Sequence, residues 1–378
     1  MSQSRQQPDG PLLRGQQVAQ YVIQEELARG GMGVVYLARH NQLEQRAVVK
    51  VLSEELLADP QHKQFVARFF DEARAITRLK HPNIVKIFDL GEMPNGVVYI
   101  LMEFLDGESL LQLLDRYGVR GGMPVGVALS IAQQLASAMA EAHRNSVLHR
   151  DLKPANVIVV PDVDGDAGVR PILIDFGLAR MLDSPYRRTK TGTVMGTPLY
   201  MSPEQCMGED VDDRTDVYSL GCMLYEMLCG HAPFDNAGPQ IFFRKASAEP
   251  PPLQSEKPDL PAAVCNLVNT MLRRERAQRP AMQAVAKQIK QIQGSVQVND
   301  GQAPEIVAPF AKTLLAPLVA PPAKGADAAT VVTPPRPAAD SDAANAGSRA
   351  VTLPPLARYA VPLALAAVAL LAWLLLRG

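Results

Sequence analysis

The sequence has few cysteines and almost no net charge, and both absences narrow the classes of protein that it can represent. Only four of its 378 residues are cysteine, and none stands in a CxxC or other zinc-ligand spacing. We therefore expect reduced thiols in a cytosolic domain rather than a disulfide framework or a zinc site. The formal net charge is −1, so no overall field indicates nucleic acid as a partner.

A long apolar run is missing from the start of the chain and present at its end. Residues 1–20 are polar, so we expect a disordered tail there and no secretory signal peptide. Residues 359–376 carry no charge and would span roughly 27 Å as a helix, close to the thickness of a bilayer. This run is apolar on every face, which favours a transmembrane helix over a buried core helix.

The residues around this run predict its orientation and how it is attached. Residues 294–358 are rich in Ala and Pro and show no core-forming period, which predicts a disordered linker. An excess of arginine before the run favours the cytoplasm for the N-terminal bulk of the chain; three arginines precede it and one follows it, namely Arg336, Arg349, Arg358 and Arg377. We therefore expect a folded domain, a tether and a single-pass anchor in a lipid bilayer.

The octapeptide His149–Asn156 carries side chains that a phosphoryl-transfer site can use. Asp151 can accept a proton from an attacking hydroxyl, and Lys153 can hold negative charge beside it. Asn156 offers a neutral oxygen ligand for Mg²⁺. An isolated HRD tripeptide is typical of charged turns, so the hypothesis requires partners elsewhere in the chain.

The region before the octapeptide supplies two such partners. Residues 21–23 and 34–38 are β-rich and flank a glycine-rich turn over 28–33, which predicts a hairpin whose backbone can approach phosphates. Lys50 lies inside the apolar run 47–52, where a charge needs a partner. The alternative is an edge-strand lysine that points into solvent. Residues 61–80 have helical spacing of apolar side chains and carry a carboxylate at Glu72.

Taken together, these motifs resemble the bacterial eukaryotic-like serine/threonine protein kinases. GGMGVVYLAR, HPNIV, HRDLKPAN, DFGLAR and GTPLYMSPEQ all occur in the order of that family, over roughly residues 21–290. The resemblance implies an α+β, bilobal fold for residues 21–293. Its N-lobe would be 21–101, its hinge 102–106 and its helical C-lobe 107–293. For a bacterial member, the anchor implies the inner (cytoplasmic) membrane.

The resemblance also assigns roles to residues. Lys50, held by Glu72, would orient the α- and β-phosphates of ATP, and Asp151 and Lys153 would act on the acceptor hydroxyl. Asn156 and Asp175 would hold Mg²⁺ (or Mn²⁺). The nucleotide would also contact the glycine-rich strands and the hinge, through Leu27, Ala28, Arg29, Gly30, Gly31, Met32, Gly33, Val34, Val35, Glu103 and Leu105.

The polar stretch between Asp175 and Glu204 resembles an activation segment. A phosphorylated threonine there would pair with arginines that include Arg150. The candidates are Thr191 and Thr193, followed by Thr189. A mobile surface loop is the alternative interpretation. Autophosphorylation in trans would require self-association of the chain.

Further residues of the family pattern are expected to act as acceptor determinants or structural supports. Lys153 and Thr197 favour Ser and Thr of protein substrates over Tyr. Glu204 is expected to pair with Arg279, and Asp216 to brace the catalytic loop. These last three residues are not counted as catalytic.

The competing hypothesis is a membrane-tethered pseudokinase that acts as a scaffold. Ala28 stands where the family pattern has its first glycine, and Val48 stands where an alanine usually meets the adenine. Added methyl groups in a crowded pocket would weaken nucleotide binding by roughly 1–2 kcal/mol.

Overall fold

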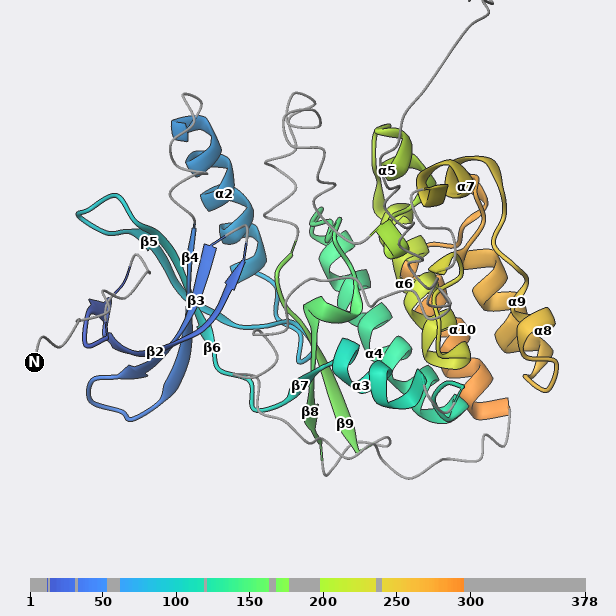
Figure 1. Ribbon diagram of the computed structural model, residues 1–378, viewed down its shortest axis with the longest axis horizontal. Helices are drawn as coiled ribbons and strands as arrows, with labels where there is room; N and C mark the ends of the chain where they lie inside the picture. Colours follow the sequence, from blue (N-terminus) through green and yellow to red (C-terminus); the bar gives the residue numbers. More distant parts are fainter. Residues whose placement is uncertain are drawn as a thin grey trace, which may run out of the picture. The chain divides into compact units, whose positions relative to one another are not determined.

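The computed structural model describes residues 12, 14–30, 33–52, 62–118, 121–162, 168–176, 198–235 and 240–295 (Figure 1). All of them belong to the first of two compact units into which the chain divides, Met1–Ala323 and Lys324–Gly378. Several predicted features lie outside the described residues: the linker beyond 295, the apolar run 359–376, and Gly31, Met32, Thr189, Thr191 and Thr193. Within the described ranges, no helix is both long enough and apolar enough to span a bilayer.

The N-terminal part forms a six-stranded antiparallel sheet with one helix, α2, packed on it (Figure 1). The order across the sheet is β1-β2-β3-β4-β6-β5. The strands are β1 (Gln17–Val18), β2 (Tyr21–Gly30), β3 (Gly33–His40), β4 (Arg46–Leu52), β5 (Ile87–Glu92) and β6 (Val98–Glu103).

The run of apolar residues in β4 is explained by burial on both faces of the sheet. Ala47, Val49 and Val51 join one apolar cluster, whereas Val48 and Leu52 join another that includes α2. Because side chains alternate between faces along a strand, Lys50 lies on the face of Val48 and Leu52. The sequence of β4 therefore places Lys50 on the face that packs against α2, whereas its other charged residue, Arg46, stands at the start of the strand.

Helix α2 (His62–Thr77) confirms the helix that the spacing over 61–80 predicts. Phe69 and Ala73 are buried in the cluster with Val48, and Ile76 is buried against the C-terminal lobe. The spacings of four and three residues place these side chains on one face of the helix. Glu72 lies one position from Ala73, at the border of that buried face.

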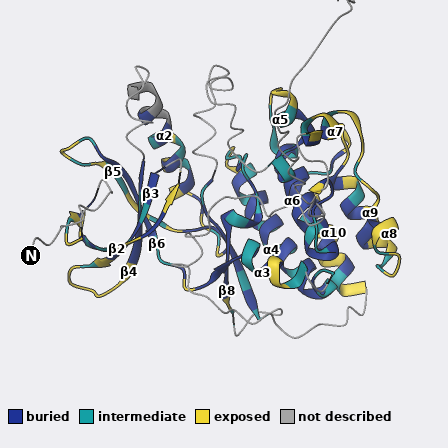
Figure 2. Ribbon diagram, in the orientation of Figure 1, coloured by how far each residue is buried: buried dark blue, intermediate teal, exposed yellow. Residues whose placement is uncertain are grey.

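The C-terminal lobe packs its helices around α4 (Val125–Arg144) and α6 (Asp213–Cys229). Figure 2 shows that α6 is buried along nearly its whole length. The other helices are α3 (Leu110–Gly118), α5 (Pro203–Met207), α7 (Ile241–Ser247), α8 (Leu253–Glu256), α9 (Ala262–Met271) and α10 (Met282–Ser295). A three-stranded sheet adjoins them, β7 (Glu108–Ser109), β8 (Val157–Pro161) and β9 (Val169–Leu173), with short 3-10 turns at Pro154–Asn156, Pro198–Tyr200 and Arg276–Gln278.

A buried ion pair joins two distant parts of this lobe. Arg279 donates to both carboxylate oxygens of Glu204 at 2.7 and 2.8 Å, and the Arg279 side chain is fully buried. Thr215 donates a further hydrogen bond to Glu204. A buried charge pair is tolerated when its hydrogen-bonding capacity is filled in this way. The expected pairing of Glu204 with Arg279 is confirmed.

The folded region starts earlier and ends slightly later than the sequence indicates. Gln17 and Val18 pair with β2, and Leu12 is 2% exposed, so the expected disordered tail over 1–20 is wrong for its last residues. A two-residue strand among polar residues has no period that a sequence pattern can reveal. At the other end α10 runs to Ser295, two residues beyond the expected limit of 293.

Candidate active site

The catalytic loop is held in place by one buried carboxylate beneath it. Asp216, in the first turn of α6, accepts hydrogen bonds from the backbone N–H groups of His149 and Arg150, each at 2.9 Å. His143 at the end of α4 approaches the same carboxylate at 2.8 Å. Two consecutive amides can reach one carboxylate because Arg150 has a φ of 60°, in the left-handed region. The expected brace by Asp216 is confirmed.

The surroundings of Asp216 keep it ionised. Burial raises the pKa of this carboxyl group, but the His143 hydrogen bond and the charges of His143 and His149 outweigh burial and lower its pKa. A carboxylate that accepts several N–H groups is favoured in its charged form. The ionised Asp216 carboxylate thus holds the backbone at Arg150 in place. The His149 N–H group that it binds in turn helps to keep the carboxylate ionised.

Asp151, which follows the braced residue Arg150 in the chain, contacts both Lys153 and Asn156. The Lys153 ammonium lies 2.8 Å from the Asp151 carboxylate. The Asn156 side-chain amide donates to the Asp151 backbone carbonyl at 2.8 Å and contacts its carboxylate at 3.1 Å. The two flanking donors fix the direction of the carboxylate, which is what a general base requires.

Asp175 follows β9 and faces Lys50 from the sheet of the other lobe. Lys50 Nζ lies 2.6 Å from Asp175 Oδ1. Burial raises the pKa of Asp175, and the charge and hydrogen bond of Lys50 outweigh burial, so that the pKa is lowered overall. Asp175 also has a left-handed φ of 53°, a conformation that Asp tolerates better than most residues. The structure therefore brings together two residues that are 125 positions apart.

Glu72 does not contact Lys50, and the expected pairing between them is wrong in this structure. The Glu72 carboxylate instead lies 3.0 Å from the Arg150 guanidinium. Burial raises the pKa of Glu72, whereas that of Asp175 is lowered. These directions reflect the pairing that the structure shows: Lys50 pairs with Asp175, and Glu72 pairs with Arg150.

The donor set around Asn156 and Asp175 fits a hard divalent cation. Both residues present side-chain oxygens, and the amide nitrogen of Asn156 is turned towards Asp151, which leaves its amide oxygen for a metal. Carboxylate and amide oxygens are the ligands that Mg²⁺ prefers. These two residues would hold the ion, with Lys50 as a neighbouring positive charge on Asp175.

An apolar cluster from both lobes lies next to this polar site. Leu27 and Val48 from the N-terminal sheet, and Met102 and Leu105 around the hinge, pack with residues of β8 and the β9 end; Val35 lies against the same cluster. Three predicted nucleotide contacts, Leu27, Val35 and Leu105, thus belong to or pack against one apolar cluster. Apolar side chains beside a few polar groups are typical of ligand sites.

The strands of the glycine-rich hairpin show which position requires glycine. Gly33 has a φ of 143°, and a Cβ there would lie 1.8 Å from the Val51 carbonyl oxygen. A Cβ at Gly30 would meet no atom within 4 Å. Ala28 lies within β2 opposite Val35 at a negative φ, so its methyl group causes no backbone strain. The loss of the first glycine of the pattern is accommodated by the strand itself.

The hinge is bracketed by Arg46 at the start of β4. Its guanidinium lies 3.0 Å from Asp106 and 4.1 Å from the centre of the Phe104 ring. Glu103 is tied to Lys86 by two hydrogen bonds, 2.9 Å from its own N–H and 2.8 Å to its carboxylate. The predicted hinge residues therefore connect to both neighbouring strands.

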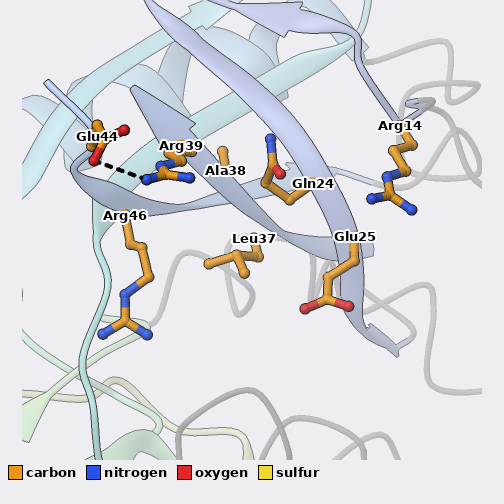
Figure 3. A pocket seen from close by; sticks show the side chains of 8 residues that line it. All are labelled: Arg14, Gln24, Glu25, Leu37, Ala38, Arg39, Glu44 and Arg46. Atoms are coloured by element: carbon orange, nitrogen blue, oxygen red, sulfur yellow. Dashed lines mark ion pairs between the residues drawn. The ribbon is translucent and has the colours of Figure 1, made fainter. Parts of the chain in front are cut away.

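A hollow of about 540 Å³ on the N-terminal sheet is separate from this site. Figure 3 shows its lining side chains and the ion pair of 3.1 Å between Arg39 and Glu44. The remaining lining residues are Arg14, Gln24, Glu25, Leu37, Ala38 and Arg46. It includes none of the residues that converge on Asp151, and its mixture of opposite charges indicates no single class of ligand.

The family resemblance places a substrate-docking loop at residues 196–204, and its described part follows the undescribed stretch 177–197. We call Pro198–Met201 the docking segment. The Tyr200 hydroxyl donates to Glu226 of α6 at 2.6 Å, and the Ser219 hydroxyl donates to the Tyr200 carbonyl at 2.8 Å. Ser202 then caps α5 in a capping box with Gln205, whose side-chain amide reaches the Arg150 carbonyl at 2.8 Å. The docking segment is thus joined to the catalytic loop through one short helix.

The site combines an oriented carboxylate with a lysine beside it and a pair of oxygen ligands, next to an apolar cluster from both lobes. This combination defines a nucleotide-dependent phosphotransferase domain. A family profile described as "protein kinase domain" matches residues 21–290. The serine/threonine-protein kinase pkn3 of Myxococcus xanthus is 37% identical over 281 residues, which are 72% of this chain and 50% of that protein. The chain belongs to the protein kinase family.

Other relatives give the same assignment. The serine/threonine-protein kinase PknF of Mycobacterium tuberculosis is 39% identical over 252 residues, 66% of this chain and 51% of its own length. The crystal structure of the PknI kinase domain of Mycobacterium tuberculosis has a TM-score of 0.57 and 30% identity, and covers 74% of this chain and 99% of that domain. The chain spans about half the length of pkn3 and PknF.

Glu226 gives the site a pH-dependent contribution to stability. Burial, together with Asp115 and Asp235, raises its pKa to about 7, against the Tyr200 hydrogen bond and the charge of His231, which lower it. A carboxyl group of ordinary pKa 4.5 in the unfolded chain then releases its proton more easily on unfolding. Its contribution is complete below the unfolded pKa and is lost as pH rises through about 7.

We therefore expect Glu226→Gln to remove part of the decline in unfolding free energy between about pH 5 and pH 7.5. The amide of Gln keeps a carbonyl that can accept the Tyr200 hydrogen bond. Urea denaturation of both proteins at a series of pH values measures the effect. Parallel pH profiles for the two proteins would show that Glu226 does not titrate in this range.

Proposed function

We propose that this chain is a protein kinase that transfers the γ-phosphoryl group of ATP to Ser and Thr hydroxyls of protein substrates. The observation that carries the proposal is the oriented Asp151 carboxylate, with Lys153 at 2.8 Å and Asn156 beside it. Relatives named serine/threonine-protein kinases support the choice of acceptor. The chemistry of the site defines the acceptors as polypeptides that carry Ser or Thr.

Each residue has a defined part in this proposal. Asp151 accepts the proton of the attacking hydroxyl, and Lys153 stabilises the negative charge that moves past it. Lys50 binds phosphate oxygens, which requires it to leave Asp175 or to bridge both groups. Asn156 and Asp175 hold the divalent ion, which when bound neutralises charge on the phosphates.

The pairing of Glu72 with Arg150 indicates that the structure represents a resting arrangement. The family pattern requires Glu72 beside Lys50 for catalysis, whereas here Lys50 pairs with Asp175 and Glu72 pairs with Arg150. A phosphorylated threonine that engages Arg150 would release Glu72 towards Lys50. Activation-loop phosphorylation is therefore proposed as the step that assembles the site, with a second copy of the chain as the phosphorylating partner.

Asp151→Asn tests the proposed activity. Loss of the base should lower the rate of phosphate incorporation about 10²–10⁴-fold, while thermal stability and nucleotide binding change little because Asn keeps the size and one oxygen of Asp. Residues 1–295 are incubated with Mg-ATP and a mixed protein acceptor, and incorporated phosphate is measured by mass spectrometry.

The same experiment tests the alternative function, a membrane-tethered scaffold without catalysis. Val48, which is buried in the apolar cluster beside the site, is the observation that favours it, because the family usually has the smaller alanine at this position. A wild-type protein that neither binds ATP nor incorporates phosphate would exclude the kinase and leave the scaffold as the remaining proposal. Val48→Ala is the matched control, since it should tighten nucleotide binding if the pocket is crowded.

Phosphopeptide mapping of the autophosphorylated wild type tests the regulatory threonines. We expect phosphate on Thr191 or Thr193, with Thr189 as the third candidate, and none in Asp151→Asn. Replacing the phosphorylated threonine by Ala should then reduce activity, because Arg150 stays with Glu72. Phosphate found only outside residues 177–197 would contradict regulation by phosphorylation of these threonines.

We also propose that residues 359–376 anchor the chain in the inner membrane, with the kinase domain in the cytoplasm. The support is the uncharged, uniformly apolar sequence and the arginines before it. Residues 294–358, rich in Ala and Pro, would serve as the tether between domain and bilayer.

Fractionation of cells that express the full chain tests the anchor. The wild type should sediment with membranes, resist extraction by carbonate and be released by detergent, because a transmembrane helix is removed only when lipid is replaced. A variant that lacks residues 359–376 should be recovered without detergent. Equal solubility of the two proteins would contradict the proposal.

A further inference from the structure

One buried lysine in α7 has no place in the mechanism described so far. Lys245 is 0% exposed, and its ammonium donates to the backbone carbonyls of Leu199 at 2.6 Å and Met201 at 2.8 Å. The ion pairs found among the described residues include none between Lys245 and a carboxylate. Burial of an ammonium group without a counter-ion is costly, so its retention requires a reason other than packing.

The surroundings of Lys245 accept a cation without neutralising it. The ammonium lies 5.1 Å from the centre of the Tyr218 ring and 5.7 Å from that of the Phe234 ring, distances at which aromatic faces attract positive charge. Cys222 lies 3.9 Å away. Burial lowers the pKa of Lys245. Apart from weak ring and sulfur contacts, the strong acceptors are the two carbonyls of the docking segment.

These contacts give every backbone carbonyl from 199 to 201 a side-chain donor. Lys245 takes the first and third, and Ser219 of α6 takes the second, that of Tyr200. The two carbonyls on either side of Tyr200 therefore converge on one ammonium, which fixes the local path of the backbone. Helix α5, which starts at Pro203 and contacts α7, continues this segment towards Arg150 through Gln205.

We propose that Lys245 is a positioning residue that sets the docking segment against Asp151 and thereby determines affinity for the acceptor polypeptide. This inference rests on the proposed kinase activity. Lys245 touches neither nucleotide nor acceptor; it acts through the carbonyls of Leu199 and Met201. Its loss should change how the acceptor binds and leave the nucleotide side of the site as it is.

If Lys245 had a purely structural role, its replacement would change stability but would not selectively change the KM for the acceptor. Lys245→Met removes the cost of burying an ammonium group but leaves the carbonyls of Leu199 and Met201 without their lysine donor, which costs free energy. Because these two effects oppose each other, we expect the domain to stay folded. If the residue served only packing, no kinetic constant would change selectively.

The test compares the full-length wild type with Lys245→Met in detergent, using as acceptor the best peptide that the wild type selects from a Ser/Thr peptide array. We expect KM for this peptide to rise at least tenfold, with kcat and the KM for ATP each within about threefold of wild type. Lys245→Gln, which keeps a side-chain donor, should be intermediate between the two.

Lys257→Met is the matched control. Lys257 also donates to a backbone carbonyl in this lobe, that of Gly121 at 2.5 Å, but far from the docking segment in the chain. The same substitution there should leave the KM for the peptide unchanged. Equal effects of the two Lys→Met substitutions would overturn the positioning role.

Hydrogen exchange separates failure of this inference from failure of the proposed function. Lys245→Met should speed exchange of the amides over 199–202 and leave those of α6 protected, whether or not the protein phosphorylates anything. A wild type without phosphate transfer would remove the proposed function. An active Lys245→Met protein with normal peptide KM, or unfolding of both Lys245 variants, would overturn the inference itself.

Discussion

The position of the reactive groups depends on the Asp216 carboxylate at the start of α6. A buried carboxylate must be surrounded by donors, and here two of them are consecutive backbone amides of the catalytic loop. That requirement forces Arg150 into a left-handed conformation, which costs of order 1–3 kcal/mol for a residue with a side chain. The hydrogen bonds to a charged acceptor offset this cost. Asp151 is thereby fixed relative to the most buried helix of the lobe.

Four charges connect this fixed loop to the N-terminal lobe. Lys50 and Glu72 come from the sheet and from α2, and Asp175 and Arg150 from the C-terminal lobe. In the arrangement proposed for catalysis, Glu72 would pair with Lys50 and a phosphorylated threonine would replace Glu72 at Arg150. Arg150 would then keep an anionic partner, so a change in charge near Arg150 would shift which cation Glu72 contacts.

The sequence predicts the local elements of the site better than its contacts. The burial of β4 on both faces and the spacing in α2 follow from hydrophobic periodicity, and they place Lys50 and Glu72 on the correct faces. The brace at Asp216 and the pair Glu204–Arg279 could be predicted only through the family resemblance, since no local pattern joins residues that are tens of positions apart.

Other features had no signal in the sequence. The cation that pairs with Glu72 is determined by the exact position of α2, and the sequence alone does not give that position. Lys245 follows Arg244 and resembles an ordinary surface lysine; its burial results from the packing of α7 against the docking segment. The short strand β1 is likewise defined only by its partner β2.

The glycine-rich hairpin shows how unevenly a sequence motif can constrain a protein. At Gly33 the neighbouring strand β4 leaves no room for a side chain, whereas at Gly30 there is open space, and at Ala28 a methyl group is already present. Ala28 is itself buried, so open space for a larger side chain exists at Gly30 but not at Gly33. A glycine at 33 is therefore required by the architecture of the sheet, independently of any ligand.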